Sequence, residues 1–170
     1  GNHDGLILNK DREDAISQNI KALDLPNLHL IKMTEKMSFN DEIDIVNFSC
    51  FDEAEWVNMS PTPEKINIGI FHGAVRGSKT DIDWVMEGEV DVSMFDDYDF
   101  IFLGDIHKHQ YLESHGRIAY CGSTIQQNFG ETPGKGYMLW EIESKNKFSS
   151  KHIKVPHDRP FVTINWEGSV

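Results

Sequence analysis

The sequence predicts an α/β fold, and three patterns support that prediction. One stretch near the start of the chain has apolar residues at helical spacing, and eight short β-rich runs follow it. Two of these runs, INIGIF at 66–71 and FIFLG at 100–104, are almost continuously apolar, which is typical of central strands covered on both faces. His72 and the GDIH stretch at 104–107 end these two runs, where open α/β sheets build their sites.

The predicted elements follow in order. A helix is expected over 11–23, because acids in its first turn complement the positive end of the helix dipole. The eight predicted strands cover 28–33, 43–49, 66–72, 99–107, 117–123, 136–142, 151–155 and 161–166. Pro156 and Pro160 mark a predicted connector, so the last strand is expected to open a second subdomain. The four tryptophans are expected in packing roles.

Composition narrows the class of protein. The chain has 170 residues and a net charge of -12, which argues against a simple nucleic-acid binder with a basic face. Nine acids and no Lys or Arg lie in 81–107, whereas 145–159 holds five basic residues and one acid. No run approaches the roughly 18 apolar residues that span a bilayer, so we expect a soluble cytoplasmic protein without membrane contact. Cys50 and Cys121 form no CxxC pattern and are expected to be free, buried thiols.

Three clusters carry the chemistry: GNHD at 1–4, FHG at 71–73 and GDIHKH at 104–109. A site for divalent metals needs imidazoles, amide oxygens and carboxylates brought together from several strand ends. Asp105 and His107 are one residue apart and can face one point from a turn or an extended segment. Mixed nitrogen and oxygen donors favour Mn, Fe or Zn over Ca.

In this order the clusters resemble three of the five motifs of the calcineurin-like metallophosphoesterases. The D-x-H and GDxxD motifs of that family are absent, so we expect that the chain begins inside the third motif, as a fragment of a longer protein. LGDIHKHQ, RIAYCGSTIQQNFGE, KGYMLWEI and VPHDRPFVTI are similar to SbcD-like DNA repair nucleases and to phage recombination endonuclease subunits. The resemblance covers nearly the whole chain.

The resemblance implies a sandwich of two mixed β-sheets flanked by helices. Residues 1–155 would be the C-terminal part of the catalytic domain, and 156–170 a connector with the first strand of a capping subdomain. It also implies two divalent metal ions, with Mn preferred and Mg, Fe or Zn as alternatives. The implied partners are DNA and an SbcC-like coiled-coil ATPase, with homodimer formation left open. A virus-encoded protein acting in host cytoplasm is one expected origin.

The resemblance also assigns roles to individual residues. It makes Asn2, His72, Asp105 and His107 metal ligands, His3 the proton donor to the leaving oxygen, and Asp4 its orienting partner. The family has histidine where this chain has Asp105, which adds negative charge and shifts the preference towards harder cations. Alternatively, Asp105 only caps a turn and metal affinity has weakened. The predicted substrate-binding residues are Lys108, His109, Ser123, Gln126 and Gln127, with Asn128 in the same loop; the alternative is an ordinary hydrogen-bonding loop.

Three functions stay open on these grounds. The first is a Mn-dependent nuclease subunit of a DNA repair or recombination complex. The second is a general or small-molecule phosphoesterase, which the charge of -12 favours because DNA binding gains affinity from Lys and Arg. The third is a non-catalytic module with a decayed metal site. Because two motifs are absent, the chain alone is expected to be weakly active or inactive.

Overall fold

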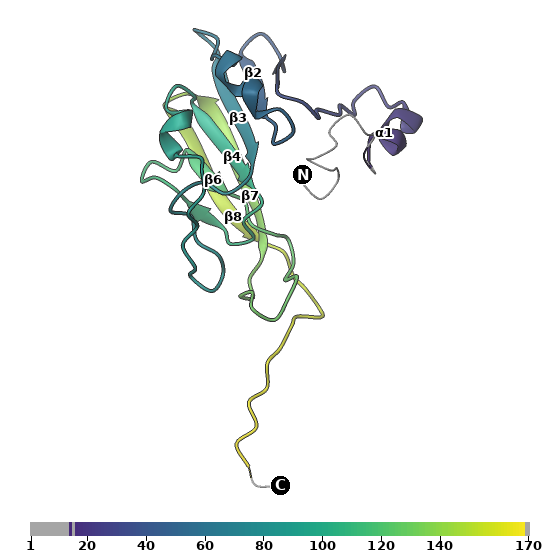
Figure 1. The fold of residues 1–170 in the computed structure, drawn as a ribbon, viewed down its shortest axis with the longest axis vertical. Coiled ribbons are helices and arrows are strands. Elements are labelled where there is room, and N and C mark those ends of the chain that lie inside the picture. The colour runs from purple at the N-terminus through teal and green to yellow at the C-terminus, as the bar shows by residue number, and fades with distance from the viewer. Residues whose placement is uncertain (1–13, 15, 169–170) are drawn as a thin grey trace.

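A six-stranded mixed sheet forms the centre of the protein (Figure 1). The structure is a computed structural model in which Asp14 and residues 16–168 are described. Across the sheet the strands lie in the order β1 (Glu35–Ser38), β2 (Ile43–Phe48), β3 (Ile66–His72), β4 (Phe100–Gly104), β6 (Ile118–Tyr120) and β5 (Gln110–Tyr111). β2, β3, β4 and β6 run parallel, whereas β1 and β5 pair antiparallel at the two edges.

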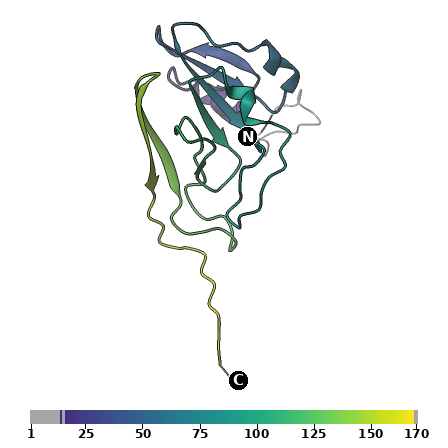
Figure 2. The same cartoon turned by 90° about the vertical axis from the view of Figure 1, so that its left-hand side faces the viewer.

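A two-stranded antiparallel hairpin covers part of one sheet face (Figure 2). It consists of β7 (Gly136–Ser144) and β8 (Lys147–Lys154). Trp140 contacts the rings of Phe100 and Phe102 on β4, and Phe148 packs edge-on against Phe100 with ring centroids 4.9 Å apart. The aromatic contacts between β4 and this hairpin therefore join the two sheets.

The main core lies on the other face of the sheet. Its buried residues are Val46, Phe48, Phe71, Val75, Phe95, Ile101, Leu103, Ile106 and Tyr120. Two short 3-10 helices pack there, η2 (Glu53–Asn58) and η3 (Val92–Phe95). Trp56 from η2 packs edge-on against Phe48 and Phe71, and Phe95 from η3 contacts the same two rings. Burial explains why β3 and β4 are apolar runs, because β4 is covered on both faces and β3 is exposed only at Ile70.

The predicted α/β class is confirmed, with differences in detail. The second sheet is antiparallel rather than mixed, and in the described part of the chain α1 (Ser17–Leu23) is the one α-helix. α1 begins later than the predicted helix over 11–23, of which 11–13 and 15 lie outside the described residues. Asp14 accepts hydrogen bonds from the N–H groups of Ile16 and Ser17, so its carboxylate satisfies the free donors at the start of the helix.

Two strand predictions are wrong. Residues 28–33 are irregular because side chains bind their backbone: Ser49 Oγ donates to the carbonyl of Lys32, and Asn47 Nδ2 to that of Met33. Residues 161–166 also form no strand, and the backbone N–H of Phe161 donates to the side chain of Gln126 instead. The edge strands β1 and β5 were not predicted.

Two packing predictions also fail. Trp56 and Trp140 pack as expected, but Trp84 and Trp166 are 68% and 81% exposed. Cys50 and Cys121 are free thiols, as predicted, yet Cys50 is only partly buried and Cys121 is exposed.

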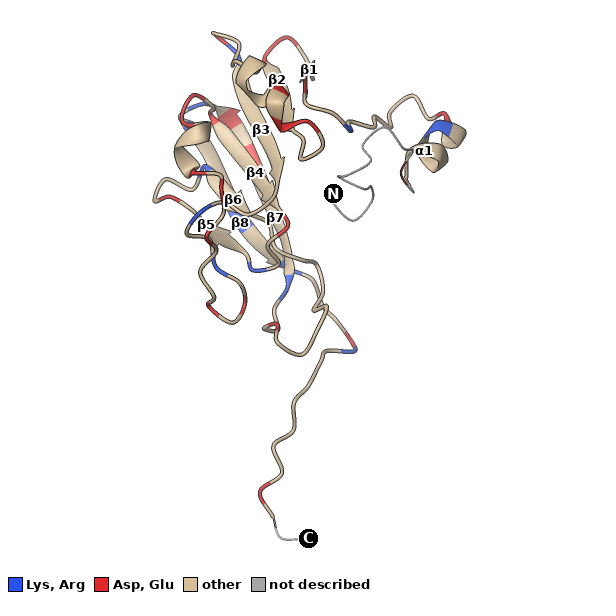
Figure 3. Cartoon of the chain, in the orientation of Figure 1, with Lys and Arg blue, Asp and Glu red and all other residues tan. Residues whose placement is uncertain are grey.

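Charge is segregated over the fold (Figure 3). β8 carries three lysines and no acid. The acids of 81–107 lie in the loops on either side of β4 and in η3's flanks rather than within β4. Within the described residues, no helix is both long enough and apolar enough to cross a membrane.

Candidate functional site

The candidate site lies where the parallel strands end. The carboxyl ends of β2, β3, β4 and β6 share one edge of the sheet, which is where open α/β sheets bind ligands. His72 is the last residue of β3, and Asp105 directly follows β4. The strand register pairs His72 with Gly104, so it brings His72 beside the turn that carries Asp105 and His107.

Glycine at position 104 lets the His72 ring lie against β4. A Cβ atom at this position would stand 2.9 Å from His72 Nδ1, closer than real side chains pack. Asp105, the next residue, has φ of +91°, in the region that favours glycine. A non-glycine residue there costs on the order of 1–3 kcal/mol, and such residues cluster at functional sites.

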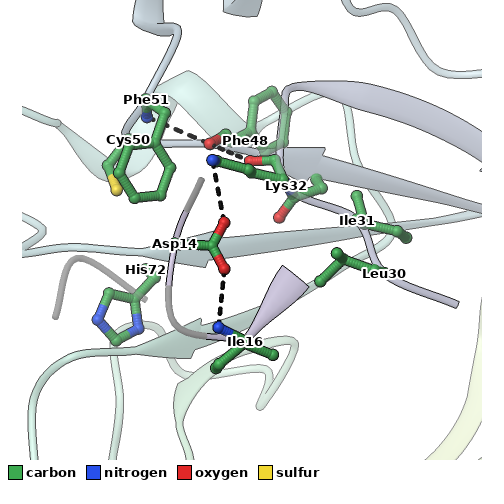
Figure 4. A pocket seen from close by; sticks show the side chains of 11 residues that line it. Asp14, Ile16, Leu30, Ile31, Lys32, Phe48, Cys50, Phe51 and His72 are labelled. Carbon is green, nitrogen blue, oxygen red and sulfur yellow. Dashed lines mark hydrogen bonds and ion pairs between the residues drawn. The ribbon is translucent and has the colours of Figure 1, made fainter. Parts of the chain in front are cut away.

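Two of the predicted ligands meet at this edge. His72 Nε2 lies 3.6 Å from Asp105 Oδ1, with both side chains partly exposed. His72 also borders a cavity of about 130 Å³ between the sheet and the start of the chain (Figure 4). In that cavity Asp14 pairs with Lys32 at 2.9 Å, and Cys50 is another of the lining residues. The hydrogen bonds from Ser17 and Lys32 keep the pKa of Asp14 well below its usual range.

The third predicted ligand, His107, has a partner that the sequence interpretation missed. Its Nδ1 lies 2.8 Å from Glu131 Oε1, in the loop between β6 and β7. Glu131 also lies 3.1 Å from Lys135 Nζ, which in turn lies 2.8 Å from Asp81 Oδ2. These three charged side chains are each less than one tenth exposed, and they form what we call the Glu131–Lys135–Asp81 network.

Both carboxylates of this network are ionised. Burial alone would raise the pKa of Glu131, but hydrogen bonds from His107, Gln127 and Lys135 outweigh it and lower that pKa. Burial likewise opposes ionisation of Asp81, whose pKa is lowered by hydrogen bonds from Lys135 and Thr132. The site therefore holds two buried negative charges around one ammonium group.

A cavity of about 360 Å³ opens beside His107, and we call it the Asp105–His107 cavity. Its lining includes the charged or ionisable residues Asp105, His107 and Glu131 and the apolar residues Ile82 and Trp84. Trp84 belongs to a short hairpin over 78–86, closed by hydrogen bonds from Met86 N to Ser78 O and from Thr80 N to Trp84 O. Because Asp81 joins this hairpin to Lys135, the wall that carries Trp84 is fixed relative to His107.

Three of the predicted substrate-binding residues line a different cavity, whereas Asn128 lines the Asp105–His107 cavity. A second cavity, of about 200 Å³, is lined by His107, Lys108, His109 and Ser123, among others. Within the described part of the chain, His109 Nε2 and Ser123 Oγ are buried without a hydrogen-bond partner. The His109 ring stacks on that of His152 with centroids 4.4 Å apart, and burial together with this neighbour lowers the pKa of His109.

Lys108, Gln126 and Gln127 already have protein partners. Lys108 Nζ donates to Asp83. The Gln126 side chain is buried, donates to the carbonyl of Glu131 and accepts from Phe161 N. The backbone N–H of Gln127 donates to Glu131 Oε2. Their roles in substrate binding stay predictions. Asn2, His3 and Asp4 lie outside the described residues.

The donors present suit a transition-metal ion in kind. Two imidazoles and a carboxylate are the mixed set that Mn, Fe and Zn accept. The surroundings of His107 also suit metal binding. Metal-binding histidines usually donate their other ring N–H to a carboxylate, as His107 Nδ1 can to Glu131. Taken by themselves, however, the described residues bring no three His, Cys, Asp or Glu side chains close enough to hold a metal ion. The described side chains are thus at most part of a ligand set.

Part of the chain is similar to a subunit of a known nuclease. No protein-family model matches the chain. It is 34% identical over 176 residues to the uncharacterized protein R555 of Acanthamoeba polyphaga mimivirus, a match that covers 96% of the chain and 13% of R555. It is 32% identical over 114 residues to the SbcD component of the nuclease SbcCD from Staphylococcus saprophyticus, over 62% of the chain and 30% of that protein. The matches span less than one third of either relative.

Proposed function

We propose that the protein hydrolyses phosphodiester bonds with divalent metal ions, as the nuclease subunit of a DNA repair or recombination complex. The observation that carries this proposal is the meeting of His72 and Asp105 at the carboxyl edge of the parallel strands, beside His107. The similarity to the SbcD component of SbcCD over 62% of the chain supports the nuclease activity, and Mn is the cofactor we propose.

Each residue of the site has one role in this proposal. His72, Asp105 and Asn2 would hold one ion, and His107 would help to hold the other through Nε2. When bound, such ions offset the charge that develops on the phosphate oxygens. His3 would donate a proton to the leaving oxygen, with Asp4 orienting its ring.

The rest of the proposal concerns the whole protein. The mixed sheet and the β7–β8 hairpin would be part of a metallophosphoesterase sandwich, with 1–155 in the catalytic domain and 156–170 as connector. The partner would be an SbcC-like ATPase, and a homodimer stays open. The similarity to a mimivirus protein supports a virus-encoded enzyme acting in host cytoplasm.

Trp84 favours a nucleic acid over a small phosphodiester as substrate. It is 68% exposed on a hydrogen-bonded hairpin and lines the cavity that Asp105 and His107 share. Aromatic side chains in such positions stack on bases, with about 1–3 kcal/mol per base. The net charge of -12 and the pairing of Lys108 with Asp83 favour the alternative, a general or small-molecule phosphoesterase.

Metal binding is the first test, because the chain alone is expected to be weakly active. Saturating Mn²⁺ should raise the melting temperature of the wild type and of Asp97→Asn, an exposed control that precedes β4, whereas the site follows the carboxyl end of that strand. Asp105→Asn should lose most of this shift. Absence of any shift in the wild type would leave the non-catalytic module as the better interpretation.

Hydrolysis is the second test. Any Mn-dependent cleavage of an oligonucleotide should fall in Asp105→Asn and stop with a chelator, and metal-independent cleavage would contradict the proposal. Salt separates the substrates: DNA binding should weaken steeply as salt rises, whereas hydrolysis of bis(p-nitrophenyl) phosphate should barely respond. Cleavage of the small ester alone, at every salt concentration, would favour the alternative.

A further inference from the structure

We propose that the Glu131–Lys135–Asp81 network positions His107, holding the imidazole with its hydrogen on Nδ1 so that Nε2 presents a lone pair to the Asp105–His107 cavity. This inference rests on the proposed function for the use of that lone pair, namely metal binding. The tautomer itself is a property of the metal-free protein and can be measured there.

The hydrogen-bond inventory of Glu131 fixes which nitrogen carries the hydrogen. Its carboxylate faces three protein donors besides His107, which are the side chains of Asn128 and Lys135 and the backbone N–H of Gln127. An ionised carboxylate only accepts hydrogen bonds. The 2.8 Å contact with His107 Nδ1 therefore requires Nδ1 to be the donor. In the neutral ring, Nε2 then keeps its lone pair.

Lys135 ties the ring to the backbone that carries it. Its ammonium group contacts Glu131 and Asp81, and it also donates to the backbone carbonyl of His107 at 2.9 Å. The same group thus holds the carboxylate that orients the imidazole and the peptide from which the imidazole projects. Asp81 is fixed in turn by two hydrogen bonds from Thr132.

Burial separates the two edges of the imidazole. The Glu131 side chain is 5% exposed, whereas that of His107 is 41% exposed. The buried partner binds Nδ1, so the exposed part of the ring is available to the cavity that His107 lines with Asp105. A carboxylate behind a histidine in this way sets the tautomer and raises the basicity of the outward nitrogen.

The tautomer is the deciding measurement, because a network that packed against the ring without accepting its hydrogen would leave both tautomers populated. The test uses the full chain, labelled with ¹⁵N and free of metal, at a pH where His107 is neutral. Long-range ¹H–¹⁵N correlation should show a protonated Nδ1 and an unprotonated Nε2 for His107. A hydrogen on Nε2, or a mixture of both tautomers, would overturn the inference.

Three variants separate positioning from packing. Glu131→Ala should give a tautomer mixture. Glu131→Gln should move the hydrogen to Nε2, because its amide oxygen takes the place of Oε2 between Lys135 and the N–H of Gln127, and its NH₂ group then donates to His107 Nδ1. Asp83→Asn, which removes the exposed Lys108 pair at the same hairpin, should change nothing. Retention of a single Nδ1–H tautomer in Glu131→Ala would contradict the inference. If Glu131→Ala does not fold, the wild type and Glu131→Gln still decide it.

Zinc alone provides the second readout. By calorimetry, the affinity of Glu131→Ala should fall about 10–100-fold, as is typical when a metal-binding histidine loses its outer partner. An unchanged zinc affinity in Glu131→Ala would overturn the positioning role. A fixed tautomer in a wild type that binds no metal would support the inference and reject the proposed function, so the two failures are distinguishable.

Discussion

Two contacts between a carboxylate and an imidazole stand at the same edge of the sheet, and they differ in kind. His72 and Asp105 lie 3.6 Å apart with both side chains open to solvent, whereas His107 and Glu131 lie 2.8 Å apart with the carboxylate buried. This contrast agrees with the roles we propose, in which Asp105 shares a metal ion with His72 and Glu131 orients the ring of His107.

The largest expected effect tests how much the Glu131–Lys135–Asp81 network stabilises the fold. Lys135→Met leaves Asp81 and Glu131 buried without their shared cation, and breaking a buried pair in this way costs about 3–5 kcal/mol of unfolding free energy. Lys108→Met is the matched control, because it removes an exposed pair between the same hairpin and the same turn. That pair contributes about 0–1 kcal/mol. Urea denaturation of both variants measures the loss of unfolding free energy. Equal losses in the two variants would contradict a stabilising role of the buried network.

The next effect concerns Trp84, which lines the Asp105–His107 cavity. Trp84→Ala should weaken binding of a single-stranded oligonucleotide by about 1–3 kcal/mol, since a base loses its stacking surface. Fluorescence anisotropy at one fixed salt concentration measures this loss. Trp166→Ala, another exposed tryptophan outside the cavity, is the control and should keep its affinity. Equal affinities in both variants would remove the support that Trp84 gives to a nucleic-acid substrate.

A smaller effect is expected from a substitution that acts on the His72–Asp105 contact alone. Gly104→Ala places a methyl group 2.9 Å from His72 Nδ1, and the ring can yield by rotating away from Asp105. We expect stability to fall by about 1 kcal/mol, at the low end of the range for overpacking. The Mn²⁺-induced shift in melting temperature should fall more clearly. The His107 tautomer should not change, and a change there would show that the two contacts are coupled.

The last expected effect is one of pH and lies away from the site. Hydrogen bonds from Lys65, Ser38 and Thr62 hold the pKa of Asp44 well below its usual range. A carboxyl whose folded pKa is depressed stabilises the fold above its unfolded pKa, near 3.9, and loses that contribution as pH falls towards the folded value. Asp44→Asn should therefore be less stable at pH 7 but show a flatter decline below pH ~4. An equally steep acid decline by circular dichroism would contradict this assignment.

The sequence predicted the strands best where burial leaves few alternatives. β4 is covered on both faces and β3 is buried over most of its length, so their apolar runs predict them directly. The runs at 28–33 and 161–166 have similar composition but form no strand. In the first run, the side chains of Asn47 and Ser49 donate hydrogen bonds to backbone carbonyl groups that a strand would use for pairing. In the second run, the side chain of Gln126 accepts a hydrogen bond from the backbone N–H of Phe161. A local pattern does not contain such contacts.

The site was predictable in part because two of its residues follow strands that the sequence predicts well. His72 and Asp105 follow two buried strands, so the register of adjacent parallel strands brings them together. Glu131 was missed because its importance depends on Asp81 and Lys135, which are 54 positions apart in the chain. In the sequence Glu131 is an acid at the end of the polar loop after β6, and its neighbours in the chain do not distinguish it from an exposed acid. The predicted roles of Asn2, His3 and Asp4 stay predictions.

The central claim is that His72, Asp105 and His107 bind divalent metal at one edge of the sheet. Paramagnetic broadening tests it directly, because Mn²⁺ broadens the NMR signals of the groups that lie next to it. Stepwise addition of Mn²⁺ to the ¹⁵N-labelled chain should broaden the His72 and His107 ring signals first. The rings of His29 and His115, elsewhere in the chain, should broaden later. Simultaneous broadening of all four rings, or none at His72 and His107, would contradict the account.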